Sequence, residues 1–80
     1  MLKQEVIRSF QDNENTEVVF YQERKGNGII RHNMFIYVNG KLLAVKCCLS
    51  YEKKNILKII TACEKAEYGL LQAVLSKLNW

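Results

Sequence analysis

Apolar and polar residues alternate along the middle of the chain, between residues 16 and 49. A period of two residues is typical of strands that bury one face, and polar segments with glycine interrupt it twice. The pattern predicts three strands, at residues 16–23, 29–38 and 41–49. Asn39-Gly40 favours a two-residue type I′ hairpin between the last two strands, because both turn positions require positive φ. Residues 24–28 (RKGNG) predict a second hairpin.

The register of these hairpins predicts which side chains share a face of the sheet, since a two-residue turn fixes the pairing of its strands. Counting outward from Asn39-Gly40 places Met34 and Val45 on one face and Phe35 on the other. For the first strand, either centre of the 24–28 turn gives the same parity. The Phe35 face is then predicted to hold Val18 and Phe20, and the Met34 face Val19 and Tyr21.

The Phe35 face mixes aromatic side chains with basic and amide groups. A contiguous apolar area with a polar rim usually marks an interface. If the helices cover the other face, we expect this one to bind a partner. The expected binding residues are Val18, Phe20, Arg31, Asn33, Phe35, Tyr37, Leu42 and Lys46.

The two ends of the chain show a different spacing of apolar residues. Leu2, Val6 and Phe10 recur every four residues, which predicts a short amphipathic helix before the first strand. From Ser50 onward the apolar residues form one stripe at about 100° per residue, which predicts a long C-terminal helix. An alternative interpretation makes residues 56–62 a fourth strand, followed by a shorter helix.

The predicted fold is therefore α+β in the order α-β-β-β-α, with a three-stranded antiparallel sheet and a long C-terminal helix in one domain over residues 1–80. The alternative has four strands and a shorter C-terminal helix. Two residues disturb the single long helix. Glu67 falls in the middle of the apolar stripe, and Gly69 costs about 1 kcal/mol relative to alanine in a helix. Whether they break the helix is left open by the sequence.

The predicted helix is longer than the predicted sheet. A helix over residues 53–80 would extend about 42 Å, whereas strands of about seven residues span about 23 Å. The uncovered part of the apolar stripe then needs a partner, and a second copy of the chain is the simplest one. We expect a homodimer whose interface includes Leu71, Val74, Leu78 and Trp80. A break at Gly69 would instead fold the last segment over the core.

Composition narrows the class of protein. The chain is 49% hydrophobic and lacks proline, which is typical of a globular fold rather than of disorder. The net charge of +4 is interleaved with acidic residues, as on an ordinary solvated surface, although an anionic partner is the alternative. The odd number of cysteines predicts no disulfide framework and a cytoplasmic location. We expect no signal peptide, membrane span, metal, cofactor or catalytic motif.

Several residues resemble the motifs of the double-stranded RNA-binding domain. They are His32, Phe35, the hairpin Asn39-Gly40-Lys41, and Ser50 followed by Lys53 and Lys54. The resemblance implies the order helix, three antiparallel strands and helix, and it implies contacts between lysines and the phosphates of duplex RNA. On this alternative the residues that bind nucleic acid are Arg24, Lys25, Lys53, Lys54 and Lys58.

The sequence thus favours a non-catalytic protein that acts by binding another macromolecule. We expect a protein partner, and a role as an inhibitor or adaptor of the kind that phages and other mobile elements encode. The alternative is a nucleic-acid-binding module similar to the double-stranded RNA-binding domain.

Overall fold

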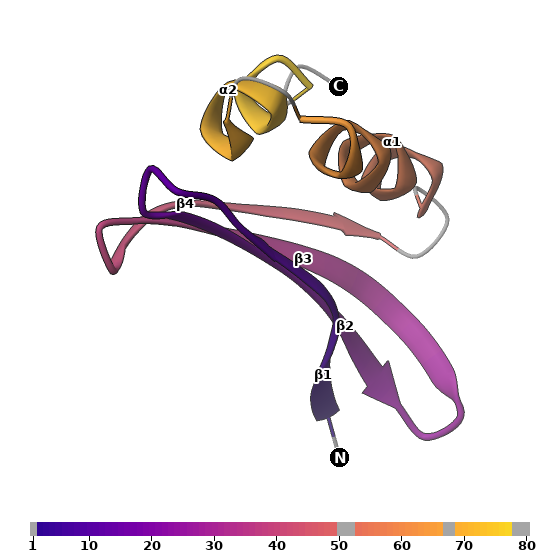
Figure 1. Ribbon diagram of the computed structural model, residues 1–80. Coiled ribbons are helices and arrows are strands. Elements are labelled where there is room, and N and C mark those ends of the chain that lie inside the picture. Colours follow the sequence, from indigo (N-terminus) through magenta and orange to yellow (C-terminus); the bar gives the residue numbers. More distant parts are fainter. Residues whose placement is uncertain (1, 50–52, 67–68, 78–80) are drawn as a thin grey trace.

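The computed structural model describes residues 2–49, 53–66 and 69–77 of the chain (Figure 1). Its elements are β1 (Leu2–Gln11), β2 (Thr16–Lys25), β3 (Gly28–Val38), β4 (Lys41–Leu49), α1 (Lys53–Glu64) and α2 (Leu70–Leu75). The strands form one antiparallel sheet in the order β1-β2-β3-β4, and both helices lie on the same face of it. The predicted α+β class is confirmed, in the alternative form with four strands and a shorter C-terminal helix.

The first segment of the chain is strand β1, so the predicted N-terminal helix is wrong. It pairs with β2 along its whole length. A spacing of four residues is close to one helical turn, but it is also twice the strand period, and Leu2, Val6 and Phe10 therefore fit either element. The β-branched Val6 and Ile7 favour the strand. The helix that begins the double-stranded RNA-binding domain has no counterpart at this position.

The C-terminal part of the chain forms two helices instead of one. The predicted apolar stripe is buried in α1, at Ile56, Ile59, Ile60 and Cys63. Residues 56–62 are therefore helical, and the additional strand is β1. Gly69, with a φ of 106°, directly precedes α2, and this backbone conformation is open to glycine but strained for other residues. Glu67 lies outside the described residues.

A β-bulge in β3 changes the register of the first hairpin. Next to the turn Arg24 lies opposite Ile29, but the following pair is Glu23 with Arg31. Ile30 is thus one extra residue in β3, with no partner of its own in β2. Because side chains alternate between faces, one extra residue reverses the parity of every pair beyond it.

The bulge corrects the predicted content of the two faces. Val18 lies opposite Ile36, and Phe20 lies opposite Met34. The prediction that Val18 and Phe20 share the face of Phe35 is therefore wrong. Both side chains point toward the helices, where each is 0% exposed.

A second bulge, in β4, shifts the other hairpin. Tyr37 lies opposite Leu42, as the Asn39-Gly40 turn predicts, but the next pair is Ile36 with Ala44. Leu43 is the extra residue. The predicted pairing holds only for the first pairs next to the turn, and the pairs farther from it are displaced by one residue.

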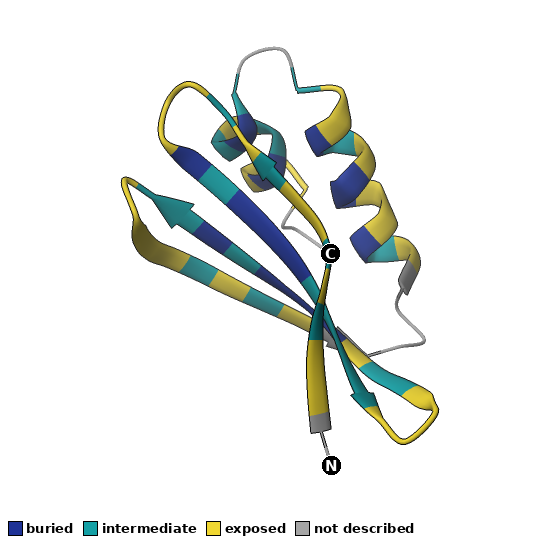
Figure 2. Ribbon diagram, turned by 60° about the horizontal axis from the view of Figure 1, so that its bottom comes forward, coloured by how far each residue is buried: buried dark blue, intermediate teal, exposed yellow. Residues whose placement is uncertain are grey.

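The hydrophobic core lies between the sheet and the two helices. In Figure 2 the buried segments lie mainly on β2, on β3 and on the helices, whereas β4 is half-buried or exposed. Burial of a large apolar side chain contributes about 1.5–3 kcal/mol, so this layer supplies most of the stability. Its members with 0% exposure are Val18, Phe20, Met34, Ile36, Ile59 and Val74.

The position of α2 removes the premise of the expected dimer. Val74 is part of the core, and Leu71 is partly buried against it. Leu78 and Trp80 lie outside the described residues. The helix ends before Gly69, and α2 packs over the core. The apolar stripe therefore does not extend beyond the sheet as the sequence predicted. Val74 is therefore buried within its own chain and is not exposed to a second copy, while the homodimer itself stays a prediction.

Candidate functional site

The face of the sheet opposite the helices is not covered by any described element (Figure 1). We call it the outer sheet face. The strand registers place these side chains on it: Gln4, Val6, Ser9, Gln11, Glu17, Val19, Tyr21, Glu23, Lys25, Arg31, Asn33, Phe35, Tyr37, Leu42, Val45 and Cys47. Half of them are apolar, and the set includes three aromatic rings.

The three aromatic rings form a row across β2 and β3. The ring centroids of Tyr21 and Phe35 are 5.0 Å apart, with an interplanar angle of 57°. Phe35 and Tyr37 meet edge to face, with centroids 6.5 Å apart. Such contacts are worth about 0.5–1.5 kcal/mol each and restrict the rotation of the rings. The row is therefore ordered before any partner arrives, which lowers the entropic cost of binding.

Exposed aliphatic side chains flank this row on both sides. Val6 on β1 is 57% exposed, and Leu42 and Val45 on β4 are 55% and 46% exposed. Val19, directly opposite Phe35, is only 8% exposed although no described helix covers it. The outer sheet face thus joins exposed and half-buried apolar side chains from all four strands. Contiguous apolar surface of this kind marks an interaction site.

A polar cluster lies at one end of the row. The Asn33 amide nitrogen donates to a Glu23 carboxylate oxygen at 2.7 Å, and the Arg31 Nε lies 3.3 Å from the other oxygen. Asn33 is 4% exposed, and its side-chain oxygen has no hydrogen-bond partner in the described part of the chain. Arg31 and Glu23 neutralise each other, so the charge of Arg31 is already paired.

Five of the eight residues that the sequence assigns to a binding surface lie together on the outer sheet face. They are Arg31, Asn33, Phe35, Tyr37 and Leu42. The other three are on the helix side of the sheet. Val18 and Phe20 are in the core, and Lys46 lies opposite Met34.

Three residues that the sequence analysis did not assign to the binding surface lie on the outer sheet face instead. Tyr21 replaces Phe20 in the aromatic row, and Val45 replaces Lys46 beside it. Val6 joins them because β1 is a strand. Alternation along β2 shows that Val19 and Tyr21 share a face, but it does not show which face, and the bulge that decides this has no sequence signal that we can identify.

The basic residues expected to bind nucleic acid come from two different parts of the molecule. Arg24 and Lys25 belong to the β2–β3 hairpin, which extends past the helices (Figure 1). Lys54 and Lys58 are exposed on α1, and Lys53 is the first residue of that helix. Arg24 and the lysines of α1 are not on the outer sheet face, and Lys25 falls on it only at the hairpin end, so the aromatic row does not lie among these basic residues.

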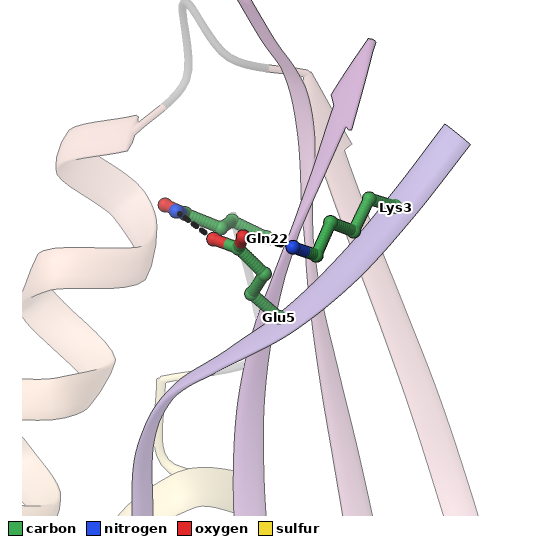
Figure 3. A network of polar contacts seen from close by, with 3 residues as sticks. All are labelled: Lys3, Glu5 and Gln22. Atoms are coloured by element: carbon green, nitrogen blue, oxygen red, sulfur yellow. Dashed lines mark hydrogen bonds and ion pairs between the residues drawn. The ribbon is translucent and has the colours of Figure 1, made fainter. Parts of the chain in front are cut away.

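A polar contact between β1 and β2 lies on the helix side of the sheet. The Gln22 amide nitrogen donates to Glu5 at 3.3 Å, and the Lys3 ammonium lies 3.7 Å from the same carboxylate (Figure 3). Glu5 and Gln22 are cross-strand partners, and Gln22 extends toward the side on which α1 lies. Lys3 is largely exposed, and exposed pairs contribute little stability. We assign this contact a structural role.

A hollow of about 620 Å³ lies between the β1–β2 turn and the start of α2. Both carboxylate oxygens of Asp12, which lines this hollow, accept hydrogen bonds. One accepts the backbone N–H groups of Glu14 and Thr16, and the other accepts that of Leu70 at 2.8 Å. The hydrogen bond from Leu70 is the main cause of a lowered pKa of Asp12. Asp12 therefore joins α2 to the sheet.

The cysteine that lines the same hollow, Cys63, has low reactivity. Cys63 is 5% exposed, and desolvation by burial raises the pKa of its thiol to about 11. A thiol with so high a pKa is almost entirely protonated near neutral pH and is a poor nucleophile. The ionisable groups of the hollow thus serve packing and helix attachment.

Comparisons with models of protein families, with curated proteins and with solved structures found no match for this chain. Within the described ranges, no group of three or more histidine, cysteine or acidic side chains is arranged to hold a metal ion. In the same ranges no helix has the length and apolar character needed to cross a membrane. Functional inference therefore depends on the geometry of the outer sheet face.

Proposed function

We propose that this chain is a non-catalytic binding protein that holds a protein partner against its outer sheet face. The observation that carries the proposal is the row of Tyr21, Phe35 and Tyr37 on an uncovered sheet, flanked by exposed aliphatic side chains. Aromatic residues at the centre of a surface with few charges are the typical composition of a protein interface.

The charge of this face favours a protein over a nucleic acid. Affinity for nucleic acids comes largely from lysine and arginine contacts to several phosphates. On the outer sheet face Arg31 is paired with Glu23. Glu17 adds a negative charge opposite Tyr37, and Lys25 adds a positive charge at the hairpin end of β2. The charges of the face therefore balance, with no excess of positive charge, although the whole chain carries a net charge of +4.

The size of the face also fits a protein partner. Four strands of about ten residues present a projected area of about 600 Å², from the usual strand spacing and rise. Stable protein interfaces bury about 800 Å² on each partner. A small chain that covers a surface of this size acts by occupying it, as an inhibitor or adaptor of the phage or mobile-element type does. A cytoplasmic location, which rests on the odd number of cysteines, is part of the proposal.

The proposal is tested by affinity capture from lysate of the organism that encodes the chain, with and without nuclease. We expect the unmodified chain to retain one protein specifically after nuclease treatment, and the double variant Phe35→Ala/Tyr37→Ala to lose it. Leu57→Ala is the matched control, since Leu57 is 48% exposed on α1. Retention of the protein by the double variant would contradict the proposal.

The same experiment addresses the nucleic-acid alternative. If the chain acts through phosphate contacts, the captured material should depend on nuclease treatment and on salt concentration. The charge-reversed variant Lys53→Glu/Lys54→Glu should then lose binding, while Phe35→Ala/Tyr37→Ala keeps it. We expect the opposite pattern.

A further inference from the structure

Strand β4 is a free edge of the sheet, because the strand order β1-β2-β3-β4 leaves one of its sides without a neighbouring strand. In an edge strand, alternate backbone N–H and C=O groups point away from the sheet and lack partners within it. An added strand is the ligand that satisfies such a row of alternating donors and acceptors.

The side chains of β4 are unusually apolar for an exposed edge. Six large hydrophobic residues are exposed in the described part of the chain, and three of them lie within four positions of β4. These are Leu42, Leu43 and Val45, with exposed fractions of 55%, 55% and 46%. Natural edge strands usually carry charges or are covered, since an apolar edge invites pairing with other chains.

The opposite edge, β1, is better protected than β4, whose own bulge at Leu43 lies next to the turn and leaves Ala44–Leu49 regular. It carries three charged residues, Lys3, Glu5 and Arg8, and a bulge at Ile7 in its middle. Arg8 is also paired with Glu64 of α1, at 3.6 Å. Charges and bulges both discourage strand addition. In the described part of the chain β1 exposes one large aliphatic side chain, Val6, and β4 exposes three, so β4 is the edge more open to strand addition.

We propose that β4 binds an extended segment of the protein partner as a fifth strand. This inference rests on the proposed function and names the form in which the partner binds. The regular part of β4 beyond its bulge is Ala44–Leu49, which pairs with β3 without further irregularity. It accommodates a segment of about six residues, or about 20 Å. Alternate side chains of that segment lie beside Val45 and extend the apolar surface of the outer sheet face.

Charge complementarity selects the chemistry of the segment. Strand β4 (KLLAVKCCL) contains two lysines and no carboxylate. A second copy of β4 is therefore a poor occupant, since it would bring four lysines into one pair of strands, and unfavourable charge pairs destabilise cross-strand contacts. An extended segment with alternate apolar residues and acidic residues at its ends fits the edge.

The test uses a phage-displayed library of random twelve-residue peptides, selected on the immobilised chain. We expect enrichment of peptides with alternating β-branched or aromatic residues and with flanking Asp or Glu. N-methylation of alternate backbone amides of a selected peptide should weaken its binding at least tenfold, because it removes strand hydrogen bonds and keeps the side chains. Amide hydrogen exchange should slow on β4 when the peptide binds.

Two variants complete the test. Leu43→Glu places a carboxylate at the edge and should weaken the selected peptide at least tenfold, while Leu57→Glu, at a similarly exposed position on α1, should change binding less than twofold. No enrichment, selection of proline-rich or basic peptides, binding that survives N-methylation, or self-association through β4 would each overturn the inference. If Leu43→Glu still captures the protein partner but Phe35→Ala/Tyr37→Ala does not, the edge inference fails while the proposed function stands. If Leu43→Glu and Phe35→Ala/Tyr37→Ala both capture the partner as the control Leu57→Glu does, the edge inference and the proposed function both fail.

Discussion

At the scale of single residues, Asp12 shows how one side chain attaches a short helix to the sheet. Its carboxylate accepts N–H groups from its own turn and from Leu70, the first residue of α2. We expect Asp12→Ala to lower the free energy of unfolding by about 1–2 kcal/mol, as the loss of a helix cap does. Urea unfolding measures this, and Asn13→Ala, an exposed neighbour, is the control. Equal effects of the two variants would contradict the assignment.

The same carboxylate predicts a dependence on pH. Hydrogen bonds, chiefly that from Leu70, lower the pKa of Asp12 below its ordinary value of 3.8 in the folded chain. A lowered pKa stabilises the fold above the unfolded-state pKa, and this contribution is lost as pH falls through the folded-state pKa. The difference in stability between the unmodified chain and Asp12→Ala should therefore be full at pH 7 and shrink below pH 3.8. A difference that does not change with pH would contradict this explanation.

Substitutions of Phe35 and Tyr37 should weaken partner binding without unfolding the chain. Both rings are half-buried on the uncovered face, so Phe35→Ala and Tyr37→Ala should leave the fold largely intact. Each should weaken partner binding by about 2 kcal/mol or more, because aromatic residues at interface centres carry most of the binding energy. Phe20→Ala, in the core, should instead cost about 3–5 kcal/mol of stability. Thermal unfolding and titration calorimetry distinguish the two effects, and unfolding of Tyr37→Ala as severe as that of Phe20→Ala would contradict the site.

At the scale of elements, Gly69 forms the N-cap of α2. Its φ of 106° is strained for residues with a Cβ, and an added Cβ would lie 3.2 Å from the Glu14 carboxylate oxygen and 3.5 Å from that of Asp12. We expect Gly69→Ala to destabilise the chain by about 1–3 kcal/mol. Gly28→Ala is the matched control, because Gly28 lacks positive φ and its Cβ would meet one backbone oxygen at 3.9 Å. Chemical denaturation of both variants decides the matter, and similar stabilities would contradict it.

Elements could be predicted from the sequence wherever the signal was local. The turn residues and the period of two placed the strands of residues 16–49 close to their observed bounds. The spacing of Leu2, Val6 and Phe10 failed because it suits a helix and a strand equally. The end of α1 was equally difficult to predict, since the apolar stripe continues past the break and only Glu67 and Gly69 indicated it.

The candidate site shows the same limit between strands. Parity along one strand needs no knowledge of its neighbours, and Arg31, Asn33, Phe35 and Tyr37 were therefore correctly grouped on β3. Parity across a hairpin depends on every bulge between the turn and the pair in question. The extra residues Ile30 and Leu43 reversed it, which moved Phe20 and Lys46 to the helix side and brought Tyr21 and Val45 to the outer sheet face.

At the scale of the whole molecule, the covered core changes what is expected of Val74. The sequence analysis placed Val74 in a dimer seam, where a charge would separate two stable copies. The structure places it in the core with 0% exposure. Val74→Glu should therefore unfold the chain, because a buried carboxylate without a partner costs several kcal/mol.

Leu75→Glu is the matched control for this last prediction, since the neighbouring Leu75 is 51% exposed on α2. It should leave the circular dichroism spectrum and the unfolding midpoint nearly unchanged, as substitutions at exposed positions usually do. Sedimentation of the unmodified chain at micromolar concentration should show a monomer, because α2 covers the core within one chain and β4 carries lysines that disfavour its self-pairing. If the unmodified chain is a dimer and Val74→Glu converts it into folded monomers, Val74 lies in a dimer interface, which contradicts the buried position of α2.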